Sequence, residues 1–141
     1  MHPDLWQRRV ADWPEVDVCS VDLGDRWEVT RWEPGGPVVY LHRRLTQVQQ
    51  RAALTHALEH LDRGAPCASL RATIEQRVVA ATARWLLPDL TAIADSISAF
   101  DGDLRRVAHE LWVPFHILLD RLRGLDAAEA RVIDDWLTRV A

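Results

Sequence analysis

The sequence predicts an α+β protein, in which a short antiparallel sheet of about three strands is followed by five to six helices. Residues 17–42 contain three short segments rich in Val, Trp and Tyr that are separated by turn residues, a pattern typical of strands. From residue 46 onward, apolar residues recur every three or four positions, which indicates helices. The chain has 141 residues, of which 48% are hydrophobic, so residues 1–141 are predicted to form a single domain with its own core.

The predicted strands follow an N-terminal segment, residues 1–16, and have the sequences VDVCSVDL, RWEVTRW and PVVYLH. Gly24-Asp25 separates the first two segments, and Pro34-Gly35-Gly36 separates the second from the third. Both separators fit the short turns of β-hairpins, in which neighbouring strands run antiparallel. The pattern therefore predicts a meander in which each strand pairs with the next along the chain.

The helical part begins with two helices within residues 46–88. The first starts after Thr46, which forms a capping box with Gln49, and it ends at Gly64. A tight turn over residues 64–66 would fold the second helix, residues 69–86, back against the first. Residues 89–141 are predicted to hold four shorter helices: 89–99, 104–112, 114–122 and 127–140, the last of them capped by Asp126 and Glu129.

The composition excludes some classes of protein. The chain has 21 acidic and 17 basic residues, and a net charge of -4 argues against nucleic-acid binding as its main task. No apolar run approaches the roughly 18 residues of a membrane span, and the first 18 residues lack the apolar stretch of a signal peptide. We therefore expect a cytoplasmic protein with reduced cysteines. All basic residues are Arg and Asn is absent, which favours a high-GC bacterial or phage origin.

Two histidines on the first predicted helix indicate a metal site. His56 and His60 lie one turn apart, so both imidazoles project from one face and can converge on one ion. A catalytic zinc ion takes three protein ligands and leaves one position for water. Glu75 is the natural third ligand, because it lies 15 positions after His60 on the helix that the predicted turn folds back. The sequence therefore predicts that His56, His60 and Glu75 bind Zn²⁺.

The residues around these ligands resemble the ImmA/IrrE family of zinc-dependent endopeptidases. The resemblance covers roughly residues 35–125 and is carried by RAALTHALEHLDRG, which ends at Gly64, and by EQRVVAATARWLLP, which begins at Glu75. It implies a zincin-like helical core and, as a substrate or binding partner, a helix-turn-helix repressor of phage, mobile-element or stress-response genes. No nucleic-acid or membrane partner is implied.

The chain departs from the family pattern at the general base. In the family, a Glu directly follows the first His, whereas this chain has Ala57 there and places its acid at Glu59, in the order His-x-x-Glu-His seen in inverzincins. On a helix, positions 57 and 59 project about 80° to either side of the direction between the two histidines. Glu59 is the predicted catalytic base. It can act as one only if substrate approaches the metal from the flank of the helix opposite to that used in the family.

Three interpretations follow from this departure: an active protease with an alternative base, a zinc-binding protein with little or no activity, and a degenerate fold that binds a protein partner. A fourth comes from residues 104–123, which are similar in outline to a DNA-reading helix-turn-helix unit. In that interpretation four arginines could contact phosphates: Arg105, Arg106, Arg121 and Arg123. The acidic net charge makes this DNA-binding interpretation the least favoured.

Overall fold

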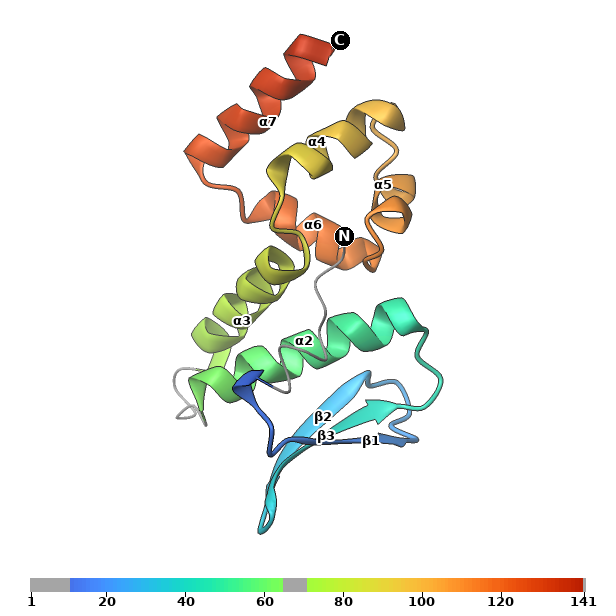
Figure 1. Cartoon of the computed structure of the whole chain (residues 1–141), viewed down its shortest axis with the longest axis vertical. Coiled ribbons are helices and arrows are strands. Elements are labelled where there is room, and N and C mark those ends of the chain that lie inside the picture. The colour runs from blue at the N-terminus through green and yellow to red at the C-terminus, as the bar shows by residue number, and fades with distance from the viewer. Residues whose placement is uncertain (1–10, 65–70, 141) are drawn as a thin grey trace. The chain divides into compact units, whose positions relative to one another are not determined.

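The computed structural model describes residues 11–64 and 71–140. In this described part, a three-stranded sheet precedes six helices, which confirms the predicted α+β class (Figure 1). The chain divides into two compact units, residues 1–78 and residues 79–141, and each is described by itself below. Of the predicted turn over residues 64–66, only Gly64 is described. Cys67 lies outside the described residues. None of the helices described is long and apolar enough to cross a membrane.

The sheet of the first unit is mixed and not wholly antiparallel. It consists of β1 (Asp17–Val21), β2 (Glu28–Glu33) and β3 (Gly36–His42) in the order β1-β3-β2. β3 pairs antiparallel with β2, as predicted, but parallel with β1. The prediction of a meander in which β1 pairs antiparallel with β2 is therefore wrong.

The loop after β1 explains this pairing. It passes across the end of β3, where the His42 amide donates to the Trp27 carbonyl over 2.9 Å and the Arg43 amide donates to the Val21 carbonyl over 2.8 Å. The Leu23 amide also donates to His42 Nδ1 over 3.0 Å. These bonds hold β1 and β2 on opposite sides of β3, so the turn at residues 24–25 connects two strands that are not neighbours.

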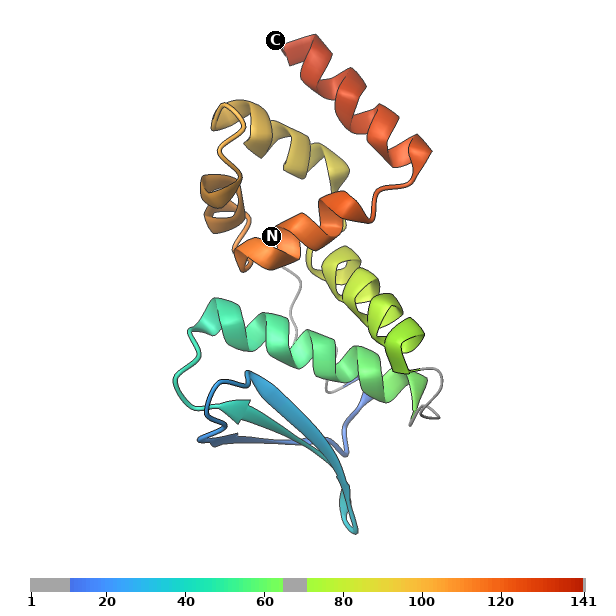
Figure 2. The same ribbon diagram turned by 180° about the vertical axis from the view of Figure 1, so that it is seen from behind.

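α2 (Gln47–Arg63) lies along one face of this sheet, as the two opposite views of the ribbon show (Figures 1 and 2). It contacts β2 and β3. The alternation of buried and half-buried residues along β3 places Val39 and Leu41 in the core, where Leu54 and Leu58 of α2 are also buried. Burial of this apolar surface fixes the position of α2 on the sheet and hence the direction in which its polar face points.

The ends of α2 are set by local chemistry. The Thr46 hydroxyl accepts from the Gln49 amide over 3.2 Å, and the Gln49 side chain accepts from the Thr46 amide over 2.9 Å, which confirms the predicted capping box. At the other end, Gly64 has a φ of 70°, a conformation that favours glycine, and its amide bonds the Leu61 carbonyl.

Replacing Thr46 by Ala is expected to lower the free energy of unfolding by about 1 kcal/mol, because the Gln49 amide loses its acceptor. Urea unfolding of the whole chain measures the change. Thr46→Ser keeps the hydroxyl and should stay within a few tenths of a kcal/mol of the original, roughly the spread of good N-cap residues. Equal losses in the two variants would contradict a role for the capping bond.

α3 (Arg71–Leu86) begins in the first unit and continues into the second. The second unit also contains α4 (Leu90–Ala99), α5 (Leu104–Glu110), α6 (Phe115–Arg123) and α7 (Ala127–Val140). The predicted helix ranges agree with these bounds within two residues, apart from the predicted start of α3 at residue 69, which lies outside the described residues. α4 packs against α5 and α7, and α5 packs against α6. The apolar side chains buried in this unit include Ile93, Ala94, Val107, Leu118 and Ile133.

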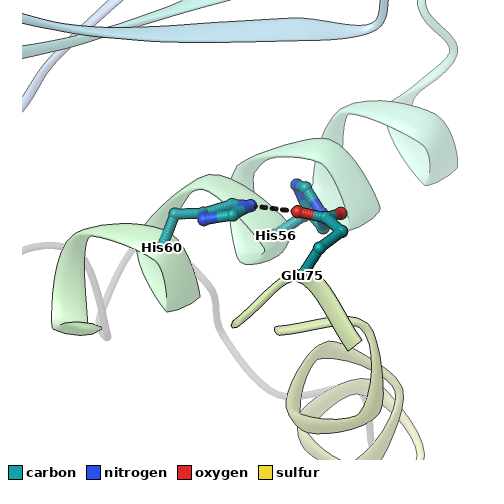
Figure 3. Close-up of side chains that lie close together, drawn as sticks. All are labelled: His56, His60 and Glu75. Atoms are coloured by element: carbon teal, nitrogen blue, oxygen red, sulfur yellow. Dashed lines mark hydrogen bonds and ion pairs between the residues drawn. The ribbon is translucent and has the colours of Figure 1, made fainter. Parts of the chain in front are cut away.

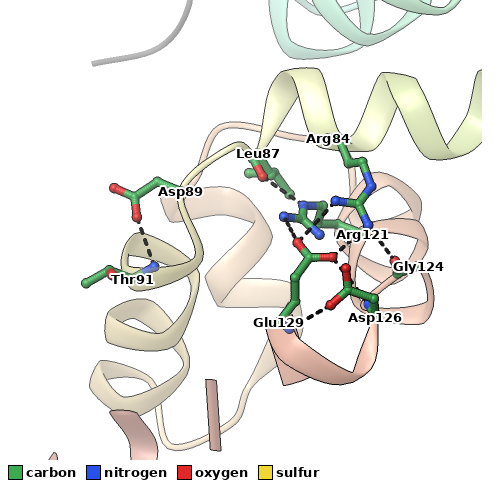
Figure 4. A network of polar contacts seen from close by, with 8 residues as sticks. All are labelled: Arg84, Leu87, Asp89, Thr91, Arg121, Gly124, Asp126 and Glu129. Atoms are coloured by element: carbon green, nitrogen blue, oxygen red, sulfur yellow. Dashed lines mark hydrogen bonds and ion pairs between the residues drawn. The ribbon is translucent and has the colours of Figure 1, made fainter. Parts of the chain in front are cut away.

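A charged cluster joins α3, α6 and α7 within the second unit (Figure 4). The Glu129 carboxylate accepts from Arg84 over 2.7 and 3.1 Å and from Arg121 over 2.9 Å. Arg121 is only 3% exposed, and its Nε also donates to the Leu87 carbonyl over 2.9 Å. Glu129 and Asp126 form the predicted capping box of α7, with bonds of 2.8 and 3.2 Å. One carboxylate thus ties a buried guanidinium to the start of a helix.

Candidate metal centre

Three side chains of the first unit come together where α2 faces α3 (Figure 3). His56 and His60 lie one helical turn apart, with their ring centroids 4.7 Å from each other and the rings nearly perpendicular. Glu75, in the N-terminal half of α3, points between the two rings. The helical spacing of the histidines and the return of the chain in α3 thus bring together the three predicted ligands.

The Glu75 carboxylate bridges the two imidazoles. Its Oε1 lies 2.8 Å from His56 Nε2, and its Oε2 lies 2.7 Å from His60 Nε2. One potential ligand atom from each of the three residues lies within 4.8 Å of the others, so the group could hold a metal ion. Among the residues that the structure describes, this is the one such group of three His, Cys, Asp or Glu side chains.

A fourth residue, Glu28 of β2, contacts this group from the sheet. Its Oε1 lies 2.9 Å from His56 Nδ1, on the side of the ring away from Glu75. Glu28 is not among the predicted site residues, because it lies 28 positions before His56 in a segment that the sequence predicts only as a strand. The one available signal was an acidic residue between the apolar residues Trp27 and Val29 of a predicted strand.

The contacts change the proton affinities of the group. Burial lowers the pKa of His56, but its hydrogen bonds to Glu28 and Glu75 and their negative charges outweigh burial, so the pKa is raised above its ordinary value. Burial raises the pKa of Glu75, and the bonds and charges of His56 and His60 reverse this and lower it. The group therefore favours a positive charge between its carboxylates, which a bound cation would also supply.

Glu59, the predicted catalytic base, is not part of this group. Its Oε2 accepts from Arg63 Nη1 over 2.8 Å, and the same nitrogen donates to the Glu59 carbonyl over 2.8 Å. The Glu59 side chain is 9% exposed. Ala57, at the position where the resembled family has its base, is completely buried in the core. The role of Glu59 as a catalytic base stays a prediction.

The four arginines of the DNA-binding interpretation lie in the second unit. Arg121 is buried and pairs with Glu129. The guanidinium groups of Arg105 and Arg106 stack over the rings of Phe115 and Phe100, at 4.3 and 4.8 Å from the ring centroids. A buried arginine cannot reach a phosphate, so Arg121 cannot take that role, whereas Arg105, Arg106 and Arg123 are exposed, and the DNA-binding interpretation stays a prediction.

Comparison of the chain with family models, with curated proteins and with solved structures finds no match. The resemblance to the ImmA/IrrE endopeptidases therefore stays a prediction that rests on the residues quoted above. What the structure adds is a group of two histidines and one glutamate that could hold a metal ion.

Proposed function

We propose that this protein is a zinc-dependent endopeptidase-like protein, with His56, His60 and Glu75 as the metal ligands. The observation that carries the proposal is the grouping of two imidazoles and a carboxylate, whose potential ligand atoms lie within 4.8 Å of one another. Two histidines and one glutamate are a donor set found at catalytic zinc sites, where the fourth position stays open for water. We further propose a helix-turn-helix repressor, or a similar regulatory protein, as the substrate.

The exposure of the group supports a catalytic site over a closed structural one. The Glu75 side chain is 49% exposed and both histidines are half-buried, so solvent reaches the ligands. The donors also fit a cation electrostatically, because a carboxylate already lies between two imidazoles that carry or share protons. Loss of those protons frees the three ligand atoms for a metal.

Peptide hydrolysis needs a metal and a proton acceptor. A zinc ion with three protein ligands activates water and polarises a peptide carbonyl. Glu59 is the base that we propose, and its carboxylate must then exchange its bond with Arg63 for one with the attacking water. His56, His60 and Glu75 would hold the metal, and the 49% exposure of the Glu75 side chain would leave it open to solvent.

The second candidate function is binding of a regulatory protein without turnover. It is favoured by two observations: Ala57 supplies no carboxylate at a buried position, and the Glu59 carboxylate is held by Arg63. In this interpretation the metal stabilises the surface that the partner recognises, and the partner leaves intact.

A helix-turn-helix repressor co-expressed with the protein tests both functions. We expect the original protein to produce zinc-dependent fragments of the repressor and His60→Ala to produce none. Glu59→Gln should keep its zinc but lose turnover by about 100-fold or more. Glu110→Gln, which removes an exposed carboxylate of α5, is the matched control and should cleave normally. A stable complex without fragments would support the second function. Neither cleavage nor complex formation by the zinc-loaded protein would contradict both.

A further inference from the structure

We infer that Glu28 is a positioning residue that orients His56 for metal binding. The inference rests on the proposed metal site and names a residue outside its three ligands. Glu28, His56 and Glu75 form a continuous chain of contacts, in which the imidazole lies between two carboxylates at 2.9 and 2.8 Å. Each ring nitrogen of His56 therefore has its own partner.

The chemistry of the Glu28 contact determines which nitrogen can bind a metal. An ionised carboxylate can only accept a hydrogen bond, so the Nδ1 atom that faces Glu28 must carry a proton. Nε2 faces the Glu75 carboxylate in the same way and is the donor there, so a metal that takes the place of the Nε2 proton would find the lone pair on Nε2 while Nδ1 keeps its proton on Glu28. Glu28 thus selects the tautomer with Nε2 as ligand atom and holds the ring plane in place.

Glu28 is well placed for this role because it belongs to the sheet and not to α2. It is paired with Leu41 in the register of β2 and β3, so its backbone position is set by the sheet. The Glu28 side chain is 18% exposed, and its Oε2 also accepts from the Thr30 hydroxyl over 3.5 Å. A hydrogen bond to a charged acceptor is stronger when both groups are partly shielded from water.

The two histidines differ in this respect. Within the described residues, the only polar contact of His60 is with Glu75, at its Nε2 atom, and no acceptor is found for its Nδ1. His56 is therefore the ligand whose orientation is fixed before a metal binds, and His60 is the one that can adjust. Removing Glu28 would leave His56, like His60, held only through its Nε2 contact with Glu75, and would increase the conformational entropy that the ring loses when a metal binds.

Zinc affinity measured by competition with a chromophoric chelator tests the inference. We expect Glu28→Ala to raise the zinc dissociation constant roughly 10- to 100-fold, the usual effect of losing such a partner. Glu28→Gln keeps an acceptor oxygen, so it should raise the zinc dissociation constant less than Glu28→Ala does. Glu33→Ala is the matched control, because Glu33 is an exposed carboxylate on the same strand that contacts Tyr40 and not the metal group, and this variant should bind zinc like the original protein.

The visible spectrum of the cobalt-substituted protein separates orientation from folding. The positioning role predicts that the spectrum changes in Glu28→Ala and returns partly to the original in Glu28→Gln. A contact that only stabilised the fold would leave the ligand field of the cobalt ion unaltered. Unchanged zinc affinity and an unchanged cobalt spectrum in Glu28→Ala would overturn it, provided that His56→Ala loses zinc. If the original protein and His56→Ala both bind no zinc, the proposed metal site itself fails, which is a different result.

Discussion

Zinc at a thousand times its dissociation constant is expected to raise the free energy of unfolding of the intact protein by about 4 kcal/mol. The proposed ligands come from α2 and α3, so they form one site only when both helices are folded and adjacent. An ion that binds the folded chain and not the unfolded one shifts the equilibrium by this amount, whatever the activity of the protein. Elemental analysis should find close to one zinc per chain.

Glu75→Ala should abolish most of this stabilisation. It removes the carboxylate that contacts both imidazoles, at 2.8 and 2.7 Å, and leaves two ligands on one helix. Urea unfolding with added zinc, compared with the same experiment in a chelator, measures the difference for each variant. His109→Ala is the control, because His109 is an exposed histidine of α5 outside the metal group, and its zinc response should equal that of the original. An equal zinc response in Glu75→Ala would show that the ion binds elsewhere.

The parts of the fold that the sequence predicts are those set by local chemistry. Thr46 and Gln49 identify the start of α2, and Asp126 and Glu129 identify the start of α7, because each capping box involves residues three positions apart. The pairing of β1 with β3 was not predictable in this way. It depends on bonds such as that between Leu23 and His42, 19 positions apart, which leave no local pattern.

The same distinction applies to the metal centre. The histidine pair follows from the helical repeat, and Glu75 follows from the expected return of the second helix. Glu28 reaches His56 from a strand, and no spacing rule relates a strand residue to a helix so far along the chain. The ion pair of Glu59 with Arg63 is different, because its spacing of four positions is a helical pattern that could have been identified.

Glu129→Gln is expected to lower the free energy of unfolding at pH 7 by about 3 kcal/mol. The carboxylate is 15% exposed and neutralises Arg121, so its loss leaves a guanidinium buried without its counter-charge. Gln keeps an oxygen for the Asp126 amide, so the capping box of α7 is retained and the change isolates the charge. Asp135→Asn, at an exposed carboxylate of the same helix, is the control and should change stability by less than about 0.5 kcal/mol.

The pH dependence of this difference follows from the pKa of Glu129. The bonds from Arg84, then those from Arg121 and the Asp126 amide, outweigh burial and lower this pKa from 4.5 to about 2. A carboxyl group whose pKa is lower in the folded chain stabilises it fully above pH 4.5, and this contribution is lost as the pH falls toward 2. The original protein and Glu129→Gln should therefore become closer in stability between these two values, while Asp135→Asn should follow the original throughout. A constant difference across that range would mean that the Glu129 charge does not hold the buried Arg121 in place.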